Sequence, residues 1–443
     1  LTANTTGGSN TSVGYKSLDA NTTGSSNTSV GKSAMGAATE GDNNTGIGAG
    51  ALGAVTTGSQ NTAVGTSAGG GTTASNNTSV GYAALTANTT AGDNTAVGVS
   101  ALAANTTGSQ NVAVGALALD ANTTAPYNTA VGYGSLGANV TGNQNTAVGY
   151  LSLAANTALK NTAVGAYAQY QSTTAQESTA IGYAALAALT SGHYNTAVGN
   201  GALSANTTGS NNTAVGYGAL DANSTSPANT AVGYNAATDV TGGENTCIGY
   251  SAASYQNSLT TGAANTIIGA YARTSSATVS NESVYGRYAL GQGANTVTLG
   301  MSGNGVHITL NGSTTSWSAH SDERFKENIQ DSTAGLSFIN DLRPITYNWK
   351  SKKDISKDFV NYYDADSDEP VQGQVKQTNH GFIAQEVKTA IDAHPEIKEG
   401  HSIWRESPDG VQNVADGALV PMLVKAIQEL SAEVETLKSQ LGE

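Results

Sequence analysis

A glycine that follows Val or Ile recurs through the first part of the chain at nearly constant intervals of 16 or 17 residues. It stands at positions 14, 31, 48, 65, 81, 98, 115, 132, 149, 165, 182, 199, 216, 233, 249 and 269. Asn occupies the fourth position before fifteen of these sixteen glycines, and Ser178 is the exception. A short fixed period of this kind indicates a repeat protein in which each unit stacks on the next one.

The consensus unit reads N-T-A-V-G-Y-x-A-L-x-A-N-T-T-G-S-x. Thr and Val flank Ala in the "NTAVG" part, and this alternation predicts a short strand with one face inward. A Leu or Met four residues after the glycine supplies a second apolar position, which predicts a short second strand, and "ANTTGS" predicts turns. We therefore expect one coil of a parallel β-solenoid or β-roll per unit. Helical repeats need about 33 residues or more and are excluded.

Each coil offers only about two medium-sized side chains to an interior, because the chain is 6% aromatic and contains 54 Gly. A roll this thin would be poorly stable alone, so we expect three chains to share one axis. Coils stacked about 4.8 Å apart would place the Asn side chains in a ladder of hydrogen bonds. We interpret the Asn row as structural, in preference to ligand or glycan binding.

The "NTAVGYGAL" coils, from Asn10 to Ala270, resemble the head repeats of trimeric adhesins and the matching segments of phage tail fibres. The coils here are longer, and they carry Thr where those heads commonly carry a larger apolar residue. The resemblance implies a trimeric, left-handed parallel β-roll.

Charge divides the chain into two parts. Residues 1–320 hold 5 Lys or Arg and 10 Asp or Glu, whereas residues 321–443 hold 13 and 22. We expect a repetitive β-roll shaft over 1–270, a cap with linker strands over 271–320, and a small α/β domain over 321–443. The net charge of -14 argues against nucleic acid or an anionic membrane as a partner. No run of 18 apolar residues is present, so we expect no membrane insertion.

The period breaks after Gly269, and "GVHITLNGSTTSWSAH" predicts two short strands with a turn at Asn311–Gly312. This region gathers the densest set of aromatic and cationic residues before position 321. Its members are Tyr271, Arg273, Tyr285, Arg287, Tyr288, His307 and Trp317. Such residues favour binding hot spots, so they are candidates for receptor contact. Capping of the solenoid end and packing between subunits remain the alternative.

The last part has the pattern of an ordinary α/β domain. "AGLSFINDLRPITYNWK" predicts a helix and a strand, "HGFIAQEVKTAIDAHPEI" a turn and a helix, and the C-terminal stretch a long helix. Apolar residues in that final helix are spaced alternately by three and four, and we call them the heptad seam: Val420, Leu423, Ile427, Leu430, Val434, Leu437 and Leu441. The seam predicts a trimerising coiled coil over about 419–441, with a core-facing amphipathic helix as the alternative.

Four segments in this order, "SDERFKENI", "LRPITYNW", "HGFIAQEV" and "ALVPMLVKAIQEL", closely resemble the C-terminal intramolecular chaperone of phage tailspikes and fibres, first associated with endosialidases. The resemblance spans about Ser321 to Leu441. It implies a domain that trimerises, guides folding of the upstream β-structure and then cuts itself off with a Ser-Lys dyad. The dyad maps onto Ser321 and Lys326.

The chemistry agrees with this mapping, because a Ser hydroxyl becomes nucleophilic when a neutral Lys amine takes its proton. The cut then falls on one side of Ser321, next to His320 or Asp322. A Ser followed by Asp-Glu is also a good helix N-cap, which is the structural alternative. In one straight helix, five residues turn the two side chains about 140° apart. Ser321 and Lys326 should therefore meet through a bend or across chains.

These observations predict a viral tail fibre or spike protein that attaches to a host. The only activity expected is a single self-cleavage, and no cofactor or metal is expected. Its partners would be two further copies of itself, upstream tail components and a host-surface glycan or protein. We expect it to fold in the host cytoplasm and to be extracellular on the released virion. The alternatives are a cell-surface trimeric adhesin, for which we expect a membrane anchor in place of the ending "KSQLGE", and the stalk of a glycan-degrading tailspike.

Overall fold

The computed structural model describes residues 2–256, 258–301, 304–310, 318–319, 326–358, 363–371, 378–398, 402–407 and 410–442. They belong to two compact units, Leu1–Ser321 and Asp322–Glu443. We call them the shaft unit and the C-terminal unit. Each has its own apolar core.

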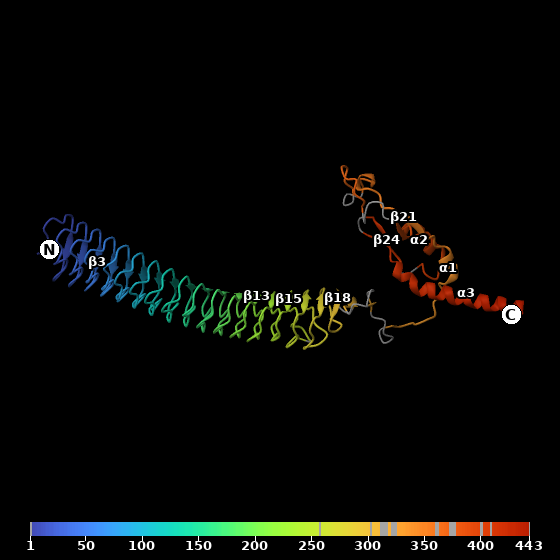
Figure 1. Ribbon diagram of the computed structural model, residues 1–443, viewed down its shortest axis with the longest axis horizontal. Coiled ribbons are helices and arrows are strands. Elements are labelled where there is room, and N and C mark those ends of the chain that lie inside the picture. Colours follow the sequence, from blue (N-terminus) through green and yellow to red (C-terminus); the bar gives the residue numbers. More distant parts are fainter. Residues whose placement is uncertain are drawn as a thin grey trace. The chain divides into compact units, whose positions relative to one another are not determined.

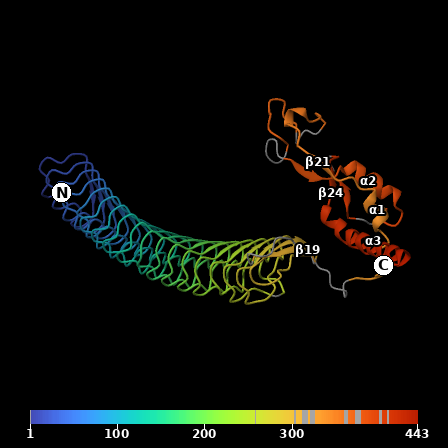
Figure 2. The same cartoon turned by 45° about the vertical axis from the view of Figure 1, so that its right-hand side comes forward.

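The shaft unit is a solenoid whose coils follow one another along an elongated, gently curved rod (Figure 1). Figure 2 shows the same coils as stacked loops. The coils carry the strands β1 Thr11–Val13, β2 Thr28–Val30, β3 Thr45–Ile47, β4 Thr62–Val64, β5 Thr78–Val80, β6 Thr95–Val97, β7 Val112–Val114, β8 Thr129–Val131, β9 Thr146–Val148, β10 Thr162–Val164, β11 Thr179–Ile181, β12 Thr196–Val198, β13 Thr213–Val215, β14 Thr230–Val232, β15 Thr246–Ile248, β16 Thr266–Ile268 and β17 Ser283–Tyr285.

Neighbouring strands pair in parallel and in the same register throughout. In β8 and β9, for example, Thr129 pairs with Thr146 and Ala130 with Ala147. The central residue, which is Ala in most strands, points inward and is buried in β2 to β17, while the flanking Thr and Val lie on the outer face. Buried leucines such as Leu119 and Leu136 complete the core. The predicted parallel β-solenoid is confirmed.

The expected short second strand is wrong for the described coils. The residues around each core Leu form turns, because two of them take a left-handed backbone: Leu117 has φ 57° and Leu119 has φ 52°. This conformation cannot continue an extended strand. The turns still join the coils, since the Leu119 N–H donates to the Ser135 carbonyl at 3.0 Å.

The Asn ladder forms as expected. The backbone N–H of Asn128 donates to Asn111 Oδ1 at 2.9 Å, and Asn128 Nδ2 donates to the Gly142 carbonyl at 3.0 Å. A second row lies beside the first, where Asn122 Nδ2 donates to Asn105 Oδ1 at 2.9 Å. Both rows reach the same carbonyl groups, since Asn111 Nδ2 and Asn122 Nδ2 both donate to the Ala125 carbonyl. These side chains are fully buried, so their hydrogen bonds satisfy polar groups that would otherwise be costly.

The recurring glycine has a steric reason. Gly149 has φ +138°, and a Cβ placed on it would lie 2.5 Å from the Gly165 carbonyl oxygen of the next coil. Both the backbone conformation and the close approach of two coils therefore require glycine at this position.

The coil length varies along the solenoid. Ladder hydrogen bonds span 17 residues in most coils, but 16 at Asn61–Asn77, Asn145–Asn161 and Asn229–Asn245. One bond spans 20, from Asn245 to Asn265. The longer coil inserts residues around Tyr255, and they enter the candidate site below.

The solenoid ends in antiparallel strands. β18 (Thr296–Met301) pairs in parallel with β17 and antiparallel with β19 (Asn304–Thr309), which in turn pairs with β20 (Ser318–Ala319). The two strands predicted on either side of Asn311–Gly312 are confirmed as β19 and β20, whereas the predicted turn itself lies outside the described residues. Sequence patterns missed β18.

In its described residues, the C-terminal unit packs three α-helices with short strand pairs. Its elements are α1 Leu336–Asn340, β21 Ile345–Tyr347, η2 Lys352–Asp354, β22 Asn379–Gly381, α2 Ala384–Ala393, β23 Trp404–Glu406, β24 Gln412–Val414, η3 Asp416–Leu419 and α3 Val420–Leu441. Phe338, Val387, Ile391 and Leu419 form the centre of its core. The expected order of helix, strand, helix and long final helix is confirmed, and the pairs β21–β22 and β23–β24 were missed.

Candidate functional site

The predicted cleavage residues His320, Ser321 and Asp322 lie outside the described residues. Lys326 opens the next described stretch and is exposed, as is the chain up to Thr333. The chain first enters the core at Ala334, which is 1% exposed. The Ser321–Lys326 dyad therefore stays a prediction. The structure does show that the chain following it becomes buried at Ala334.

The heptad seam lies on the surface of the C-terminal unit. Its residues are exposed by between 41% at Val434 and 77% at Leu441. The neighbouring Ala426 and Leu419 are buried, so α3 turns another side toward its own core. An apolar groove of about 670 Å³, lined in part by Leu342, Ile345 and Phe382, borders the seam at Leu423. A row of exposed apolar side chains this long is suited to packing against other helices.

Four of the predicted receptor-contact residues come together near the end of the solenoid. The rings of Tyr271 and Tyr288 stack with centroids 4.7 Å apart at an angle of 5°. The guanidinium of Arg287 lies 4.9 Å from the centre of the Tyr288 ring, and that of Arg273 lies 5.8 Å from the Tyr255 ring. We call Tyr250, Tyr255, Tyr271, Tyr288, Arg273 and Arg287 the aromatic–arginine cluster.

Tyr255 was missed by the sequence reasoning, although the 20-residue spacing of its coil was a usable signal. Its ring meets Tyr271 edge-on at 5.0 Å and Tyr288 at 5.9 Å. Burial of the Tyr271 phenol, with the neighbouring Tyr250 and Tyr288, raises its pKa. Since stacked rings cover one another's faces, the cluster offers ring edges, hydroxyls and guanidinium groups to a ligand.

The other predicted contact residues are placed differently. Tyr285 ends β17, at the sheet position that Ile268 occupies in β16. His307 lies in β19, where it pairs with Thr298. Trp317 lies outside the described residues. The structure thus gathers Tyr271, Arg273, Arg287 and Tyr288 but does not place Tyr285 or His307 among them.

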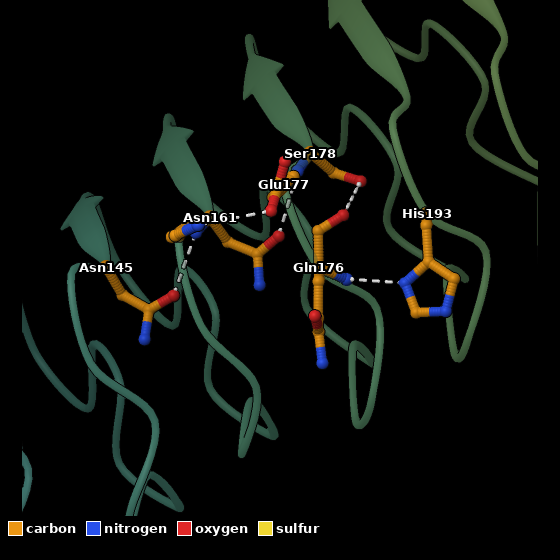
Figure 3. Close-up of polar contacts among 7 residues, drawn as sticks. Asn145, Asn161, Gln176, Glu177, Ser178 and His193 are labelled. Carbon is orange, nitrogen blue, oxygen red and sulfur yellow. Dashed lines mark hydrogen bonds and ion pairs between the residues drawn. The ribbon is translucent and has the colours of Figure 1, made fainter.

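The main Asn row is interrupted at Ser178, and Figure 3 shows its surroundings. The Ser178 N–H donates to Asn161 Oδ1 at 3.1 Å, so the ladder continues in spite of the exchange. Beside it, the Gln176 N–H donates to His193 Nδ1 at 3.1 Å, and Lys160 pairs with Glu177 at 3.3 Å. That ion pair is half exposed and contributes little stability. The arrangement keeps the hydrogen-bond ladder continuous and does not indicate a catalytic or binding site.

His394 in the C-terminal unit lies between two carboxylates. Its imidazole is almost buried, with Nε2 2.8 Å from Asp341 Oδ2 and Nδ1 2.9 Å from Glu396 Oε1. Because carboxylates only accept, both nitrogens must donate and the ring is charged. The hydrogen bond to Asp341, followed by that to Glu396, raises the pKa of His394 above 6.5. The ends of α1 and α2 are thereby linked.

This linkage predicts a stability that falls with rising pH. A raised folded pKa contributes stability below the unfolded pKa of His, and the contribution disappears as pH rises through the folded pKa. The melting temperature of the C-terminal unit should therefore decrease as the pH rises above about 6.5, the ordinary pKa of His. Tryptophan fluorescence can follow the transition, since Trp349 and Trp404 belong to the C-terminal unit. His394→Gln should melt lower at pH 6 and lose most of this slope. An equal slope in parent and variant would contradict the assignment.

Among the described residues, no three His, Cys, Asp or Glu side chains are grouped to hold a metal. In the same part of the chain, every helix is too short or too polar to cross a bilayer.

Comparison with known families identifies the C-terminal segment. Residues 321–394 match the model of a peptidase family described as the chaperone of endosialidase. Such a family implies self-cleaving peptidase activity in general. The matched segment begins at the predicted nucleophile and includes α1, β21, β22 and α2. No curated protein and no solved structure matches the chain. The chain thus combines a β-solenoid of about 17-residue coils with a C-terminal segment that matches the chaperone of endosialidase family over residues 321–394.

Proposed function

We propose that the protein is a trimeric tail fibre or tailspike protein of a virus, which attaches to a host and carries a self-releasing chaperone at its C-terminus. The match of residues 321–394 to the chaperone of endosialidase carries this proposal, because such a chaperone lies directly after a long β-structured rod here. The rod is the part whose folding would need help, since nearly identical coils can pair out of register at little cost.

Two surfaces support a homotrimer. On the shaft, the outward Val or Ile of each strand and the Tyr after the glycine form long rows, in which Val164 is 36% and Tyr150 45% exposed. On α3, the heptad seam is exposed from end to end. Contiguous apolar surfaces of this length are the kind that further copies of a chain cover.

The release step would use Ser321 and Lys326. The Ser321 hydroxyl would give its proton to the neutral Lys326 amine while its oxygen adds to the His320 carbonyl carbon. Breaking the His320–Ser321 C–N bond leaves an ester on the Ser321 oxygen, and the proton passes to the new amine. Water then hydrolyses the ester. Because Lys326 is exposed in the single chain, its amine would have to be desolvated by a bend of the segment or by another subunit.

Receptor contact is assigned to the aromatic–arginine cluster. Guanidinium groups held by aromatic rings, next to phenol hydroxyls, suit hydrogen bonds to hydroxyl and carboxylate groups of a surface glycan or a protein. The same proposal places the protein in the virion tail, joined to upstream tail components.

Light scattering and mass spectrometry of the purified chain test the proposal together. A trimer is expected, together with polypeptides shorter than the 44.4 kDa chain. Leu430→Asp should give monomers or aggregates, since each trimer would bury three carboxylates in the seam. Glu433→Asp on the same helix is the control and should remain trimeric. A stable monomeric parent would overturn the trimer.

A further inference from the structure

After the predicted cleavage segment, the first buried residues of the chain lie against α3, the helix that carries the heptad seam. Residues 326–333 are exposed, and the chain becomes buried at Ala334 and Gly335. Helix α1 begins directly after them at Leu336. Whatever fixes this point also limits where the preceding segment can lie.

Helix α1 has no cap of its own. Its N-cap residue is Gly335, which has no side chain to accept a hydrogen bond, and its first turn contains no acidic residue. The missing acceptor comes from α3, 93 residues further along the chain. There, Glu429 Oε2 accepts the Leu336 N–H at 2.7 Å. A carboxylate in this position satisfies a free amide and also favours the positive end of the helix.

The contact is closely fitted. A Cβ on Gly335 would overlap the Glu429 carboxylate, so only glycine permits this approach. Lys425, one turn earlier on α3, lies 3.4 Å from Glu429 Oε1 and holds the other side of the carboxylate. Phe338 of α1 and Leu419 at the start of α3 share the same core. Glu429 therefore joins two elements that already pack together.

The position of Glu429 on α3 separates this contact from the seam. At 100° per residue, Glu429 lies 100° from Leu430 and 160° from Ile427, so it reaches α1 while the seam stays exposed. Helix α3 can thus pack against other copies of the chain with one face and contact the start of α1 with another.

We propose that Glu429 is a positioning residue that makes self-cleavage depend on the assembled α3. When α3 is folded and held in the trimer, Glu429 fixes the start of α1 and thereby the segment that leads back to Lys326 and Ser321. When α3 is frayed, the anchor is released and the dyad is not held together. This inference rests on the proposed self-cleavage, and it adds the means by which assembly regulates it.

The test compares full-length variants for oligomeric state, cleavage rate and hydrogen exchange. Glu429→Ala should remain trimeric by light scattering, yet cleave at least tenfold more slowly, with at least tenfold faster exchange of the Leu336 amide. Gly335→Ala, which displaces the carboxylate without removing it, should behave in the same way. Glu429→Gln keeps an acceptor oxygen and should recover most of the rate. Glu433→Ala, elsewhere on α3, should match the parent.

Two outcomes would overturn the inference: a trimeric Glu429→Ala that is cut at the parental rate, or Leu336 exchange that is unchanged by the substitution. Loss of cleavage in both Glu429→Ala and Glu429→Gln, with unchanged exchange, would likewise oppose a positioning role. The parent chain could also remain uncut while Glu429→Ala still speeds hydrogen exchange at Leu336. This result would overturn the self-cleavage proposal, but it would support the role of Glu429 in fixing the start of α1.

Discussion

The chain with Ser321→Ala should stay whole after folding, whereas the parent should separate into fragments of residues 1–320 and 321–443. Removing the attacking oxygen eliminates the only group that can form the ester, so the cleavage rate should fall by at least about 10³-fold. Lys326→Ala should have a comparable effect, since the hydroxyl then lacks its base. Gel electrophoresis and the intact mass of each variant measure the result.

Both variants should still form trimers, because assembly is assigned to the heptad seam and to the outer rows of the shaft, not to the hydroxyl. Ser332→Ala, in the same exposed connection, is the matched control and should be cut like the parent. Efficient cleavage of Ser321→Ala would refute the dyad and favour the helix N-cap interpretation of Ser321.

Gly149→Ala should destabilise the shaft by at least about 3 kcal/mol. The new Cβ would have to accept φ +138° and would meet the Gly165 carbonyl oxygen at 2.5 Å. Neither problem can be relieved locally, since the clashing atom is backbone of the next coil and that coil is fixed by the one after it. Thermal unfolding followed by circular dichroism should show a clearly lower melting temperature.

The shaft contains a matched control for this substitution. Gly201 also has a positive φ, of +67°, but a Cβ on it would meet no atom within 4 Å. Ala83 and Ala184 occupy the equivalent position of other coils with φ 54°. Gly201→Ala should therefore change stability by less than about 0.5 kcal/mol. Equal melting temperatures for Gly149→Ala and Gly201→Ala would contradict the steric explanation.

The solenoid was predictable because its determinants lie within one coil. Alternation around the central Ala, the Asn four residues before the glycine and the buried Leu each repeat often enough to exclude other folds. The turn around Leu119 was not predictable from propensity, since Leu rarely takes a left-handed backbone. Hydrogen bonds between coils and burial of the Leu side chain outweigh that local preference.

The candidate sites were predictable only where their residues are close in the sequence. Tyr271, Arg273, Arg287 and Tyr288 were found as a dense group, whereas Tyr255 belongs to them through an insertion in the preceding coil. Contacts across long separations left no local signal. His394 meets Asp341 across 53 residues, and Glu429 meets Leu336 across 93. Such pairings depend on how helices dock, which no short pattern encodes.

The uniform register of the coils also has an evolutionary consequence. Since several coils meet their neighbours through the same Thr–Thr, Ala–Ala and Val–Val pairs, as in β8–β9 and β12–β13, gain or loss of one coil by recombination between repeats leaves the remaining pairs matched. Each event would change the length of the rod by about 4.8 Å. Gene rearrangement can therefore lengthen or shorten the shaft in small steps. No new core packing has to evolve each time, because the added or removed coil has the same core positions.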